Sequence, residues 1–587
     1  MRFSQLAEYL QKLEDTTKRL EITAILAELI DELENKETDI ALYMSRGYLK
    51  AEFETERFNI AEKMMIKILS QAYGTDEKIV KGKYSTLGDL GTVAGELSTG
   101  KGFKLNIVET HAALMDIAVT EGSGSQERKI LKSAQLLQTA EPTTAKFLTR
   151  IILGNVRLGF TELTIVEALV LLLNGAKDKE MKKVIENKYR IHPDIGLIAK
   201  RIKQKGVKGL KDVKMEVGVP VHAQKAQRLS GAEEIIEKMG EVWIEYKFDG
   251  TRAQLHMDRD KTMKKSSFDQ QDMFATEKEI LFTKTFTRNL EETTHQFPDI
   301  VEAANVQIDA TSVILDGEAI GYNKETGKFL PFQETIQRKR KHGIADAAKQ
   351  IPLKYMVFDI LYLNGESLVD MPLIERRKLL DSIIKKGEVI VVDEYTKTED
   401  AKVVAKESKD ALAKGLEGIM IKKVNSPYQA GARNFTWVKM KKSEEQILGD
   451  TDDCVALGYY FGRGARAKFG IGGFLAAVWD ENEERYKTLT KVGSGLKDDE
   501  WGVLKKMADK LAIGAPIKNA DIEKKYYCDV WTKPEIVVEL AADELSKSKE
   551  HSSGFALRFP RLVKFRTDKS ATDTTTPSEV AQIYNNQ

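Results

Sequence analysis

The chain has 587 residues, which is too long for one hydrophobic core and indicates roughly three or four domains. Apolar residues make up 42% of it and charged residues 31%, so the composition is that of a folded globular protein and excludes a disordered or fibrous one. The 91 basic and 90 acidic residues leave a net charge of +1. This balance neither indicates nor excludes a nucleic-acid partner, because the distribution of charge over the surface decides that.

The sequence pattern gives no sign of secretion or of a membrane anchor. The longest strongly apolar run, Ala168 to Leu173, is too short to span a bilayer. The first residues lead into an acidic amphipathic pattern and not into a secretory segment. Cys454 and Cys528 are the only cysteines, which excludes a disulfide framework and favours a reducing compartment. We therefore expect a cytoplasmic protein without a targeting signal.

The first two hundred residues have the pattern of helices. Phe3, Leu6 and Leu10 recur at helical spacing, and proline is scarce before Pro220. An all-helical domain is the best interpretation. The basic stretch Lys200–Lys214 marks a junction, which is either a solvated linker or a strip that lies along phosphates.

After Pro220 the pattern changes to short β-rich runs with helical stretches between them, such as Ile374 to Lys386, and this mixture favours an α+β domain. The predicted strands lie at 242–246, 313–315, 355–358, 389–392 and 418–421. From about Ser443 short strands separated by glycines dominate, which suits a small barrel of the oligonucleotide-binding (OB) type. The polar stretch Thr567–Thr576 is expected to be loosely held.

Gly95 to Lys101 matches most of a phosphate-binding P-loop. Gly102 replaces the hydroxyl residue that should ligate magnesium, however, and no buried strand precedes the segment. We therefore interpret it as an ordinary loop of the helical domain.

A more informative segment runs from Glu245 to Arg252. Lys247 follows the apolar run Val242-Trp-Ile and has aromatic neighbours, so it is expected at the dry end of a buried strand. Desolvation lowers the pKa of a lysine, and a deprotonated lysine is a nucleophile. Gly250 permits a sharp turn beside it, and Arg252 could hold a phosphate or a sugar. Taken alone, the segment could equally be a β-turn with solvated charges.

Other candidate residues accompany it along the chain. Asp316-Gly-Glu318 is predicted to close one strand and Glu417 to open another, and carboxylates at strand ends can hold Mg²⁺. Phe358 could stack on a base, although a phenylalanine is by default part of a core. The lysines of Trp437-Val-Lys-Met-Lys could hold phosphates. The order and co-occurrence of these features favour a nucleotide site.

Together these motifs resemble the ATP-dependent DNA ligases of the three-domain type found in archaea, in some bacteria and in the eukaryotic replicative enzymes. The resemblance covers essentially the whole chain and implies a multidomain fold. It implies an all-α DNA-binding domain over residues 1–215, an α+β nucleotidyltransferase (adenylation) domain over 216–442, and a β-barrel OB-fold domain over 443–587.

The resemblance also implies residue roles. Lys247 would carry AMP, Glu245 would read the adenine amino group, and Arg252 would lie near the ribose and phosphates. Phe358 would stack on adenine. Glu318 would bind the nucleotide at the ribose and also be associated with the metal, and Glu417 would be the second acid associated with the metal. The basic residues implied to bind ATP or AMP are Arg288, Arg433, Lys439, Lys441, Arg566 and Lys569. Arg288 lies in a motif in which Thr287 replaces the usual serine.

On the DNA side, Arg150 and Arg157 with their neighbouring glycines resemble phosphate contacts of the helical domain. The implied substrates are ATP and nicked double-stranded DNA, with Mg²⁺ as cofactor, and the implied state is a cytoplasmic, nucleoid-associated monomer. No clear sliding-clamp peptide is found, so a clamp interaction is left open. The polar stretch 258–284 is expected to be an inserted hairpin or loop.

The implied reaction joins a 5′-phosphate to a 3′-hydroxyl at a nick through a lysyl-AMP and a DNA-adenylate, in replication, repair or recombination. An mRNA-capping guanylyltransferase or an RNA ligase could share the lysine motif, but a capping enzyme needs no helical region of this size. A non-catalytic nucleic-acid clamp is a third alternative. The complete set of nucleophile, metal-binding acids and final basic motif argues against it.

Overall fold

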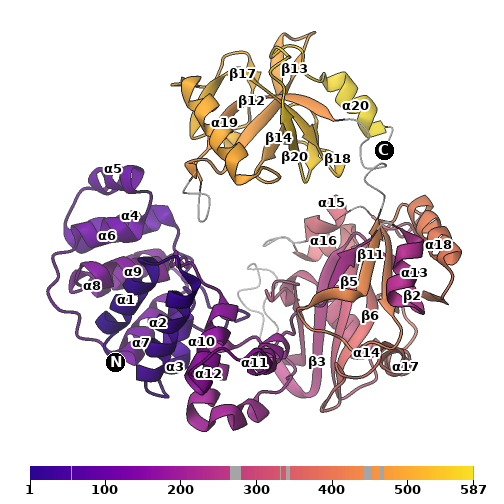
Figure 1. Ribbon diagram of the computed structural model, residues 1–587, viewed down its shortest axis with the longest axis horizontal. Coiled ribbons are helices and arrows are strands. Elements are labelled where there is room, and N and C mark those ends of the chain that lie inside the picture. The colour runs from indigo at the N-terminus through magenta and orange to yellow at the C-terminus, as the bar shows by residue number, and fades with distance from the viewer. Residues whose placement is uncertain are drawn as a thin grey trace. The chain divides into compact units, whose positions relative to one another are not determined.

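The structure is a computed structural model of the chain, and it describes residues 1–54, 56–229, 231–264, 279–330, 332–338, 344–441, 451–462 and 469–585. The chain forms two compact units, Met1–Met440 and Lys441–Gln587. The first unit contains a helical region followed by a region of two sheets with helices, and the second unit is built mainly of strands (Figure 1).

The helical region has one continuous core, to which the predicted periodic residues Phe3, Leu6 and Leu10 belong. Asp or Asn side chains cap the N-termini of five helices, and Pro142 begins another, as helix-start preferences predict. The elements are α1 (Phe3–Glu14), α2 (Arg19–Glu32), α3 (Thr38–Ser45), α4 (Glu62–Tyr73), α5 (Glu77–Leu87), α6 (Leu90–Leu97), α7 (Ile107–Ala118), α8 (Ser125–Gln138), α9 (Pro142–Ile152), α10 (Glu162–Asn174), α11 (Lys179–Ile191), α12 (Ile195–Lys205) and the 3₁₀ helix η1 (Gly206–Asp212).

The basic stretch Lys200–Lys214 is not a linker. Most of it belongs to α12 and η1, and Leu210 is buried in the helical core. Lys203 donates hydrogen bonds to the carbonyl oxygens of Ile30 and Asp31 at 2.5 and 2.7 Å, where α2 ends. The lysine thus satisfies carbonyl groups that a helix end leaves without partners.

The P-loop-like segment has a packing role. Gly95 lies inside α6, and a Cβ there would come within 3.1 Å of the carbonyl oxygen of Pro142. A Cβ at Gly100 would come within 2.5 Å of the carbonyl oxygen of Ala140. The glycines therefore allow close approach to the start of α9, and the interpretation that this is no phosphate loop agrees with the geometry.

The region after the helices contains two sheets. The β2 sheet has the strand order β1-β11-β10-β2-β9, and the β5 sheet has the order β4-β3-β5-β6-β7 with β8 beside β6. The strands are β1 (Lys225–Arg228), β2 (Val242–Lys247), β3 (Thr251–Lys264), β4 (Glu279–Phe286), β5 (Ser312–Gly321), β6 (Leu353–Leu363), β7 (Glu366–Ser367), β8 (Ile390–Val392), β9 (Tyr395–Thr398), β10 (Gly418–Lys423) and β11 (Arg433–Lys441).

Helices cover one face of each sheet (Figure 1). The helices α13 and α18 pack on the β2 sheet, and α14 and α17 pack on the β5 sheet. A further core cluster joins the sheets, with Ile314 and Leu361 from one and Trp437 from the other. The helices are α13 (Ala232–Met239), η2 (Thr294–Gln296), α14 (Pro298–Gln307), α15 (Phe332–Thr335), η3 (Ile336–Arg338), α16 (Ile344–Gln350), α17 (Leu373–Ile383) and α18 (Ala401–Ala413).

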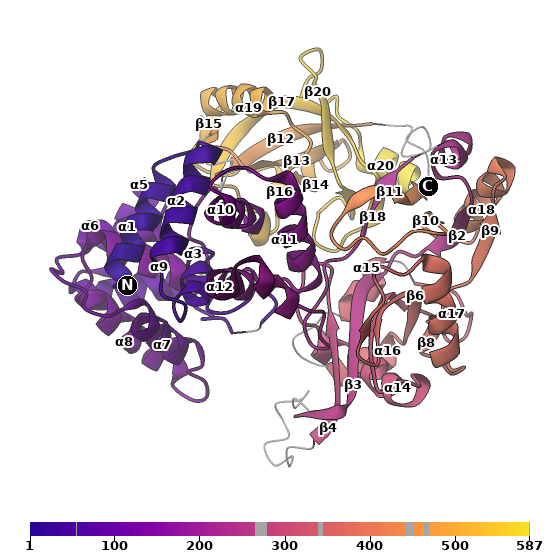
Figure 2. The same ribbon diagram turned by 60° about the horizontal axis from the view of Figure 1, so that its bottom comes forward.

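All five predicted strands of this region and the helix expected near 374–386 are present. Two expectations need correction or limitation. Asp316 and Glu318 lie within β5 and not at its end. The polar stretch 258–284 begins and ends in the antiparallel pair β3 and β4, which projects beyond the rest of the sheet in Figure 2. Residues 265–278 lie outside the described residues, and whether the hairpin is an insertion stays a prediction.

The second unit has the strand order β15-β17-β12-β13-β14-β16, with β20 beside β17 and a separate β18-β19 pair. The short strands expected after Ser443 are found, and α19 packs on the sheet through Trp501 and Leu504. The elements are β12 (Asp452–Tyr460), β13 (Gly473–Asp480), β14 (Arg485–Val492), α19 (Asp498–Lys510), β15 (Ala512–Ile513), β16 (Ala520–Asp521), η6 (Lys524–Tyr526), β17 (Val530–Ala541), β18 (Glu544–Lys547), β19 (Phe555–Arg558), β20 (Arg561–Phe565) and α20 (Pro577–Asn585).

The stretch Thr567–Thr576 is held to this sheet, contrary to expectation. The hydroxyl oxygen of Thr574 accepts a hydrogen bond from the backbone of Trp479 at 2.9 Å. The backbone of Thr575 donates to the carbonyl oxygen of Asp453 at 2.9 Å. After it, α20 buries Val580 in the core. In the described parts of the chain, no helix is both long and apolar enough to cross a bilayer.

Arg150, expected to contact DNA, is instead part of the interior of the helical region. Its side chain is only 4% exposed. The guanidinium donates to Asp89 at 2.7 and 2.9 Å and to Glu14 at 3.0 Å. An arginine whose charge is already paired with two carboxylates in a buried position is suited to a structural role. The DNA contact of Arg150 stays a prediction that these contacts do not support.

We predict that Arg150→Ala lowers the free energy of unfolding by about 3 kcal/mol, because it leaves the buried carboxylate of Asp89 without its partner. Arg157→Ala is the control, since that side chain is 41% exposed and an exposed ion pair contributes at most about 1 kcal/mol. Denaturant unfolding followed by the helical circular-dichroism signal measures both. If Arg150→Ala were as stable as the parent but no longer bound DNA, the result would support a contact between Arg150 and a DNA phosphate.

Candidate active site

Lys247 is the last residue of β2, and the chain turns there into the other sheet. Its backbone pairs with Gly418 of β10, so it lies beside Glu417. The turn requires Gly250, because a Cβ at that position would come within 2.6 Å of the carbonyl oxygen of Ala319 in β5. This close approach places the end of β2 against the middle of β5, which carries Glu318.

The environment of Lys247 lowers the pKa of its amine and so shifts it toward the neutral form. Burial lowers the pKa of Lys247 below its ordinary value, and the positive charges of Arg252 and Arg288 lower it further. The carboxylates of Glu318 and Asp249 act in the opposite direction. The Lys247 side chain also forms an ion pair with Glu417. A buried lysine in this position is a group that can lose its proton and attack an electrophile.

Glu245 and Lys422 form a buried ion pair two residues before Lys247. The Lys422 Nζ atom lies 2.5 Å from Glu245 Oε2, and both side chains are at most 2% exposed. The same Nζ atom lies 4.6 Å from the centre of the Phe358 ring and 4.5 Å from that of Trp437. Glu245 Oε1 accepts no hydrogen bond from the described residues, although Arg377 Nη1 forms an ion pair with it at 3.7 Å. A carboxylate oxygen that accepts no hydrogen bond can recognise a flat base that carries an amino group.

Both Glu318 and Glu417 lie close to Lys247, since Glu318 influences its pKa electrostatically and Glu417 forms an ion pair with it. Burial raises the pKa of Glu318 to about 7, so its negative charge lacks full compensation. The described residues contain no cluster of three or more acids, histidines or cysteines that could enclose a metal. Two carboxylates fit Mg²⁺, which proteins often bind through one or two carboxylates and substrate phosphates.

Of the predicted basic residues, Lys439 and Arg288 lie near Lys247, and Arg433 lies near Lys439. Burial lowers the pKa of Lys439, and the nearby charges of Lys247, Arg433 and Arg288 contribute to that shift. Lys441 follows Lys439 by two residues on β11, so both leave the strand on the same side. Arg566 and Lys569 lie in the second unit, where both form ion pairs with Asp453, at 3.0 and 2.6 Å.

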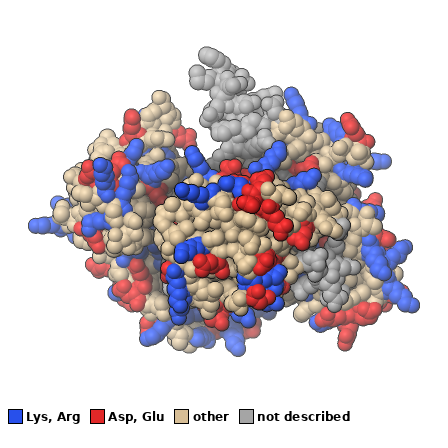
Figure 3. Space-filling view, turned by 90° about the horizontal axis from the view of Figure 1, so that it is seen from above, with Lys and Arg blue, Asp and Glu red and all other residues tan. Residues whose placement is uncertain are grey.

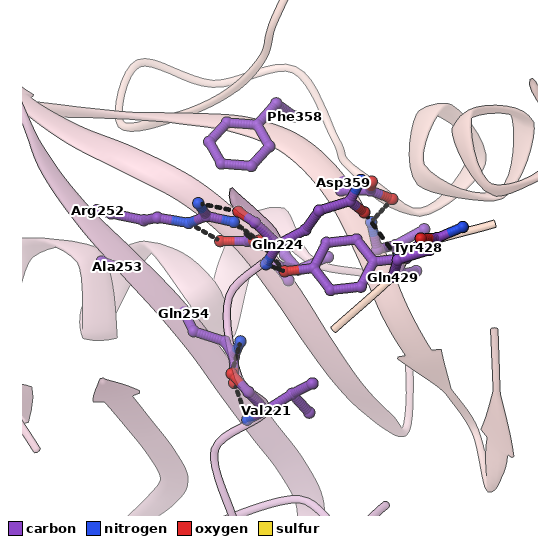
Figure 4. Close-up of polar contacts among 12 residues, drawn as sticks. Val221, Gln224, Arg252, Ala253, Gln254, Phe358, Asp359, Tyr428 and Gln429 are labelled. Carbon is purple, nitrogen blue, oxygen red and sulfur yellow. Dashed lines mark hydrogen bonds and ion pairs between the residues drawn. The ribbon is translucent and has the colours of Figure 1, made fainter. Parts of the chain in front are cut away.

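Arg252, on β3, is held by several contacts (Figure 4). Its Nε and Nη2 atoms donate to the two carboxylate oxygens of Asp316 at 3.0 and 2.6 Å, and Nη1 donates to the carbonyl oxygen of Gln224 at 2.9 Å. The guanidinium carbon lies 5.4 Å from the centre of the Phe358 ring. Arg252 therefore packs beside the half-buried ring, and its orientation is fixed by its partners.

The sequence alone did not identify the residues that support this site. Asp359 follows Phe358 and forms a fully buried ion pair with Arg376 of α17, at 2.7 and 2.8 Å. Lys422, Gln224 and Tyr428 were also missed. Lys422 offered a signal, because a lysine inside the apolar run of β10 is unusual in a buried strand.

Arg157 remains at the surface of the helical region. It has a left-handed backbone conformation, with φ of 59°, and its Nη2 atom donates to the carbonyl oxygen of Gly88 at 2.8 Å. Figure 3 shows basic and acidic side chains interspersed on the face it displays, as the near-zero net charge suggests. If DNA contacts this face, individual basic side chains would have to hold it, because the described residues of the face form no large area of positive charge alone.

The geometry therefore brings Lys247, two carboxylates and several basic side chains together where the two sheets meet. Family models match residues 2–170 (DNA ligase N terminus), 277–441 (ATP dependent DNA ligase domain) and 467–569 (ATP dependent DNA ligase C terminal region). Lys247 lies outside these stretches but within the full-length similarity to relatives.

Among the relatives, a probable DNA ligase of Dictyoglomus turgidum is 38% identical over 595 residues, covering 100% of this chain and 98% of the relative. A DNA ligase of Saccharolobus solfataricus is 34% identical over 613 residues, with 100% and 98% covered. A solved structure named Pmar-Lig_Pre shares the fold at 17% identity, with a TM-score of 0.54 and 96% of this chain and 99% of that chain covered.

The chain belongs to the ATP-dependent DNA ligase family. It is an enzyme of the ligase class that uses ATP and acts on DNA, and sealing of nicks is the general activity of the family. Its architecture is the three-domain one, with a helical N-terminal domain, a central adenylation domain and a C-terminal sheet domain.

We predict that Arg376→Met lowers the free energy of unfolding by about 3 kcal/mol or more, because it leaves the buried carboxylate of Asp359 without a partner. The double variant Arg376→Met/Asp359→Asn removes that charge and should cost at least about 1 kcal/mol less than the sum of the single changes. Denaturant unfolding of the full chain measures this coupling. Strict additivity of the two single effects would contradict the pairing.

Proposed function

We propose that the enzyme seals nicks that carry a 5′-phosphate and a 3′-hydroxyl, through an AMP adduct on Lys247 and a DNA-adenylate. The observation that carries the proposal is the position of Lys247 at a buried strand end close to Glu417 and Glu318, in surroundings that lower its pKa. The full-length similarity to DNA ligases supports the reaction class.

In the first step the Nζ atom of Lys247 attacks the α-phosphorus of ATP. A nitrogen–phosphorus bond forms, the bond from the α-phosphorus to the bridging oxygen breaks, and pyrophosphate leaves. Attack needs the unshared electron pair, so the amine gives up its proton, and burial of the side chain favours this loss. The basic side chains of Lys439 and Arg288 lie where they would neutralise phosphate charge.

The base would be recognised by Glu245 and Phe358. The unused Glu245 Oε1 atom accepts a hydrogen bond from the adenine amino group, and the half-buried Phe358 ring stacks on the base. Arg252, fixed next to that ring, lies near the ribose and phosphates. Arg433 and Lys441, on β11, would complete the phosphate-binding set.

Glu318 and Glu417 would hold Mg²⁺. When bound there, the ion supplies charge neutralisation on the phosphate oxygens. The raised pKa of Glu318 supports this assignment, because a cation would offset the carboxylate charge that burial disfavours.

In the second step the 5′-phosphate of the nick attacks the AMP phosphorus on Lys247, and the nitrogen–phosphorus bond breaks to give a DNA-adenylate. In the third step the 3′-hydroxyl attacks the 5′-phosphate, and AMP leaves. Replication, repair and recombination all produce such nicks. A cytoplasmic, nucleoid-associated monomer remains our expectation, and a clamp partner is left open by the sequence.

We place the domain boundaries at 1–215, 216–442 and 443–587, and we assign the last domain to the OB fold. The antiparallel β17-β12-β13-β14 path supports this assignment. Arg157, next to Gly154 and Gly159, is the more exposed candidate for a phosphate contact of the helical domain.

We predict that Lys247→Ala abolishes covalent labelling by α-labelled ATP, because no amine remains to attack. Lys247→Arg should fail as well, since a guanidinium does not give up its proton. Lys423→Ala is the matched control, because that lysine is exposed on the neighbouring strand and should leave labelling unchanged. Labelling is read on a denaturing gel. A heat-stable AMP adduct on the alanine variant would refute the nucleophile assignment.

Arg566 and Lys569 provide a second test. If they meet the leaving pyrophosphate, the double alanine variant should fail on ordinary nicks with ATP yet seal DNA that already carries a 5′-adenylate at close to the parent rate. Arg485→Ala serves as control, because it breaks an ion pair with Asp521 in the same unit. Parent-like sealing of both substrates would mean that the pair only anchors the chain to Asp453.

A further inference from the structure

A single buried hydroxyl group connects the partners of Arg252. The Tyr428 hydroxyl accepts hydrogen bonds from the backbone N–H of Gln224 at 3.0 Å and from Arg252 Nη2 at 3.3 Å, and it donates to Asp316 Oδ2 at 2.8 Å (Figure 4). A tyrosine hydroxyl has one donor and two acceptor positions, so all of its capacity is used.

The surroundings of this hydroxyl are dry. Gln224 and Asp316 are fully buried, and Tyr428 is 3% exposed. A buried polar group without a partner is costly, so loss of the hydroxyl would leave the remaining groups to rearrange. The hydrogen bonds of the Tyr428 hydroxyl therefore favour one relative position of Gln224, Arg252 and Asp316.

The same segment of chain is fixed by the Gln224 side chain. Its Oε1 atom accepts from the backbone of Gln429 at 2.7 Å, and its Nε2 atom donates to Thr436 Oγ1 at 2.8 Å. Tyr428 lies between β10 and β11, far in sequence from Arg252 on β3. Gln224 thus positions the segment that contains Tyr428, so that its hydroxyl contacts Asp316 and Arg252.

The contacts leave Arg252 little freedom. Asp316 binds Nε and Nη2, the Gln224 carbonyl oxygen binds Nη1, and Tyr428 takes the second hydrogen of Nη2. Among the described residues this leaves one N–H of Nη1 for a ligand. Asp316 alone would fix the plane of the guanidinium, and Tyr428 prevents the pair from shifting within that plane.

We infer that Tyr428 is a positioning residue for nucleotide binding, which acts by holding the guanidinium of Arg252 beside the ring of Phe358. The inference rests on the proposed role of Arg252 at the ribose and phosphates. The competing explanation is packing alone, because the Tyr428 ring also meets Trp437 edge to face, with centroids 5.7 Å apart.

Tyr428→Phe separates these explanations, since it keeps the ring and removes only the hydroxyl. In the full-length enzyme we expect kcat/KM for self-adenylation to fall about tenfold, mainly through a higher KM for ATP, as for loss of one hydrogen bond to a charged group. If Tyr428 acts through ring packing alone, the variant keeps both kinetic constants of the parent, whatever its unfolding midpoint. That result would overturn the inference.

Tyr355→Phe is the matched control. It removes another buried hydroxyl of the same domain, whose partners are the carbonyl oxygens of Ala253 and Leu315 at 2.8 and 3.4 Å. It should lower the unfolding midpoint without raising the KM for ATP. A rise in KM equal to that of Tyr428→Phe would mean that any lost hydroxyl in this domain has the effect, and would overturn the inference.

Two further variants separate the failure of this inference from failure of the proposed function. Lys247→Ala tests the nucleophile, and Arg252→Ala tests whether the guanidinium contributes to ATP binding. If Lys247→Ala is inactive and Arg252→Ala has a raised KM while Tyr428→Phe behaves as the parent, only the positioning role is refuted. If Arg252→Ala keeps the parent KM, the inference fails although the nucleophile assignment stands.

Discussion

The interior between the two sheets contains charges, and the need to compensate them determines much of the surrounding structure. Glu245 pairs with Lys422, Arg252 with Asp316, and Asp359 with Arg376. Each pair joins two different elements of the fold, and a charge removed from water is tolerated only beside an opposite one with good hydrogen bonds. Burial shifts the pKa values of Lys247 and Glu318 toward the neutral form, and it does the same to Glu245 and Lys439.

The degree of charge compensation distinguishes side chains that hold the structure in place from side chains that can interact with a ligand. Fully matched pairs such as Asp359 and Arg376 have no capacity left for a ligand, so they define where Phe358 lies. Incompletely matched groups such as Glu318 gain stability when a ligand of opposite charge arrives. Perturbed pKa values gather at functional sites for this reason. The two sheets therefore hold a set of paired charges around a few groups, such as Glu318, whose charge is less fully compensated.

The sequence predicted the strands well where β-branched and apolar residues form short runs, as in β2 and β10. It predicted Lys247, Glu417 and Phe358 as neighbours only through a recognised order of motifs. It placed Asp316 and Glu318 at a strand end because Asp-Gly is most often a turn. The structure puts Gly317 inside β5, where a Cβ would come within 2.6 Å of the Tyr355 ring. That contact involves another strand and could not be foreseen from local pattern.

Arg150 could not be assigned from the sequence, for a similar reason. Its partners Glu14 and Asp89 lie 136 and 61 residues away, so nothing near Arg150 distinguishes a buried ion pair from a surface charge. The lysines of α12 and η1 are a related case, because their acceptors include carbonyl oxygens of α2. The local pattern of apolar and polar residues does not indicate which distant polar groups pair with one another.

The parallel pairing of β1 with β11 has a mechanical consequence. The chain enters the β2 sheet at Lys225, the start of β1, and leaves it at Lys441, the end of β11. Because the strands are parallel, tension between the preceding and following segments pulls them along their length in opposite directions. The hydrogen bonds between them then bear the load together and do not open one at a time. Pulling on the two flanking regions thus loads this edge of the sheet in shear and does not peel it apart.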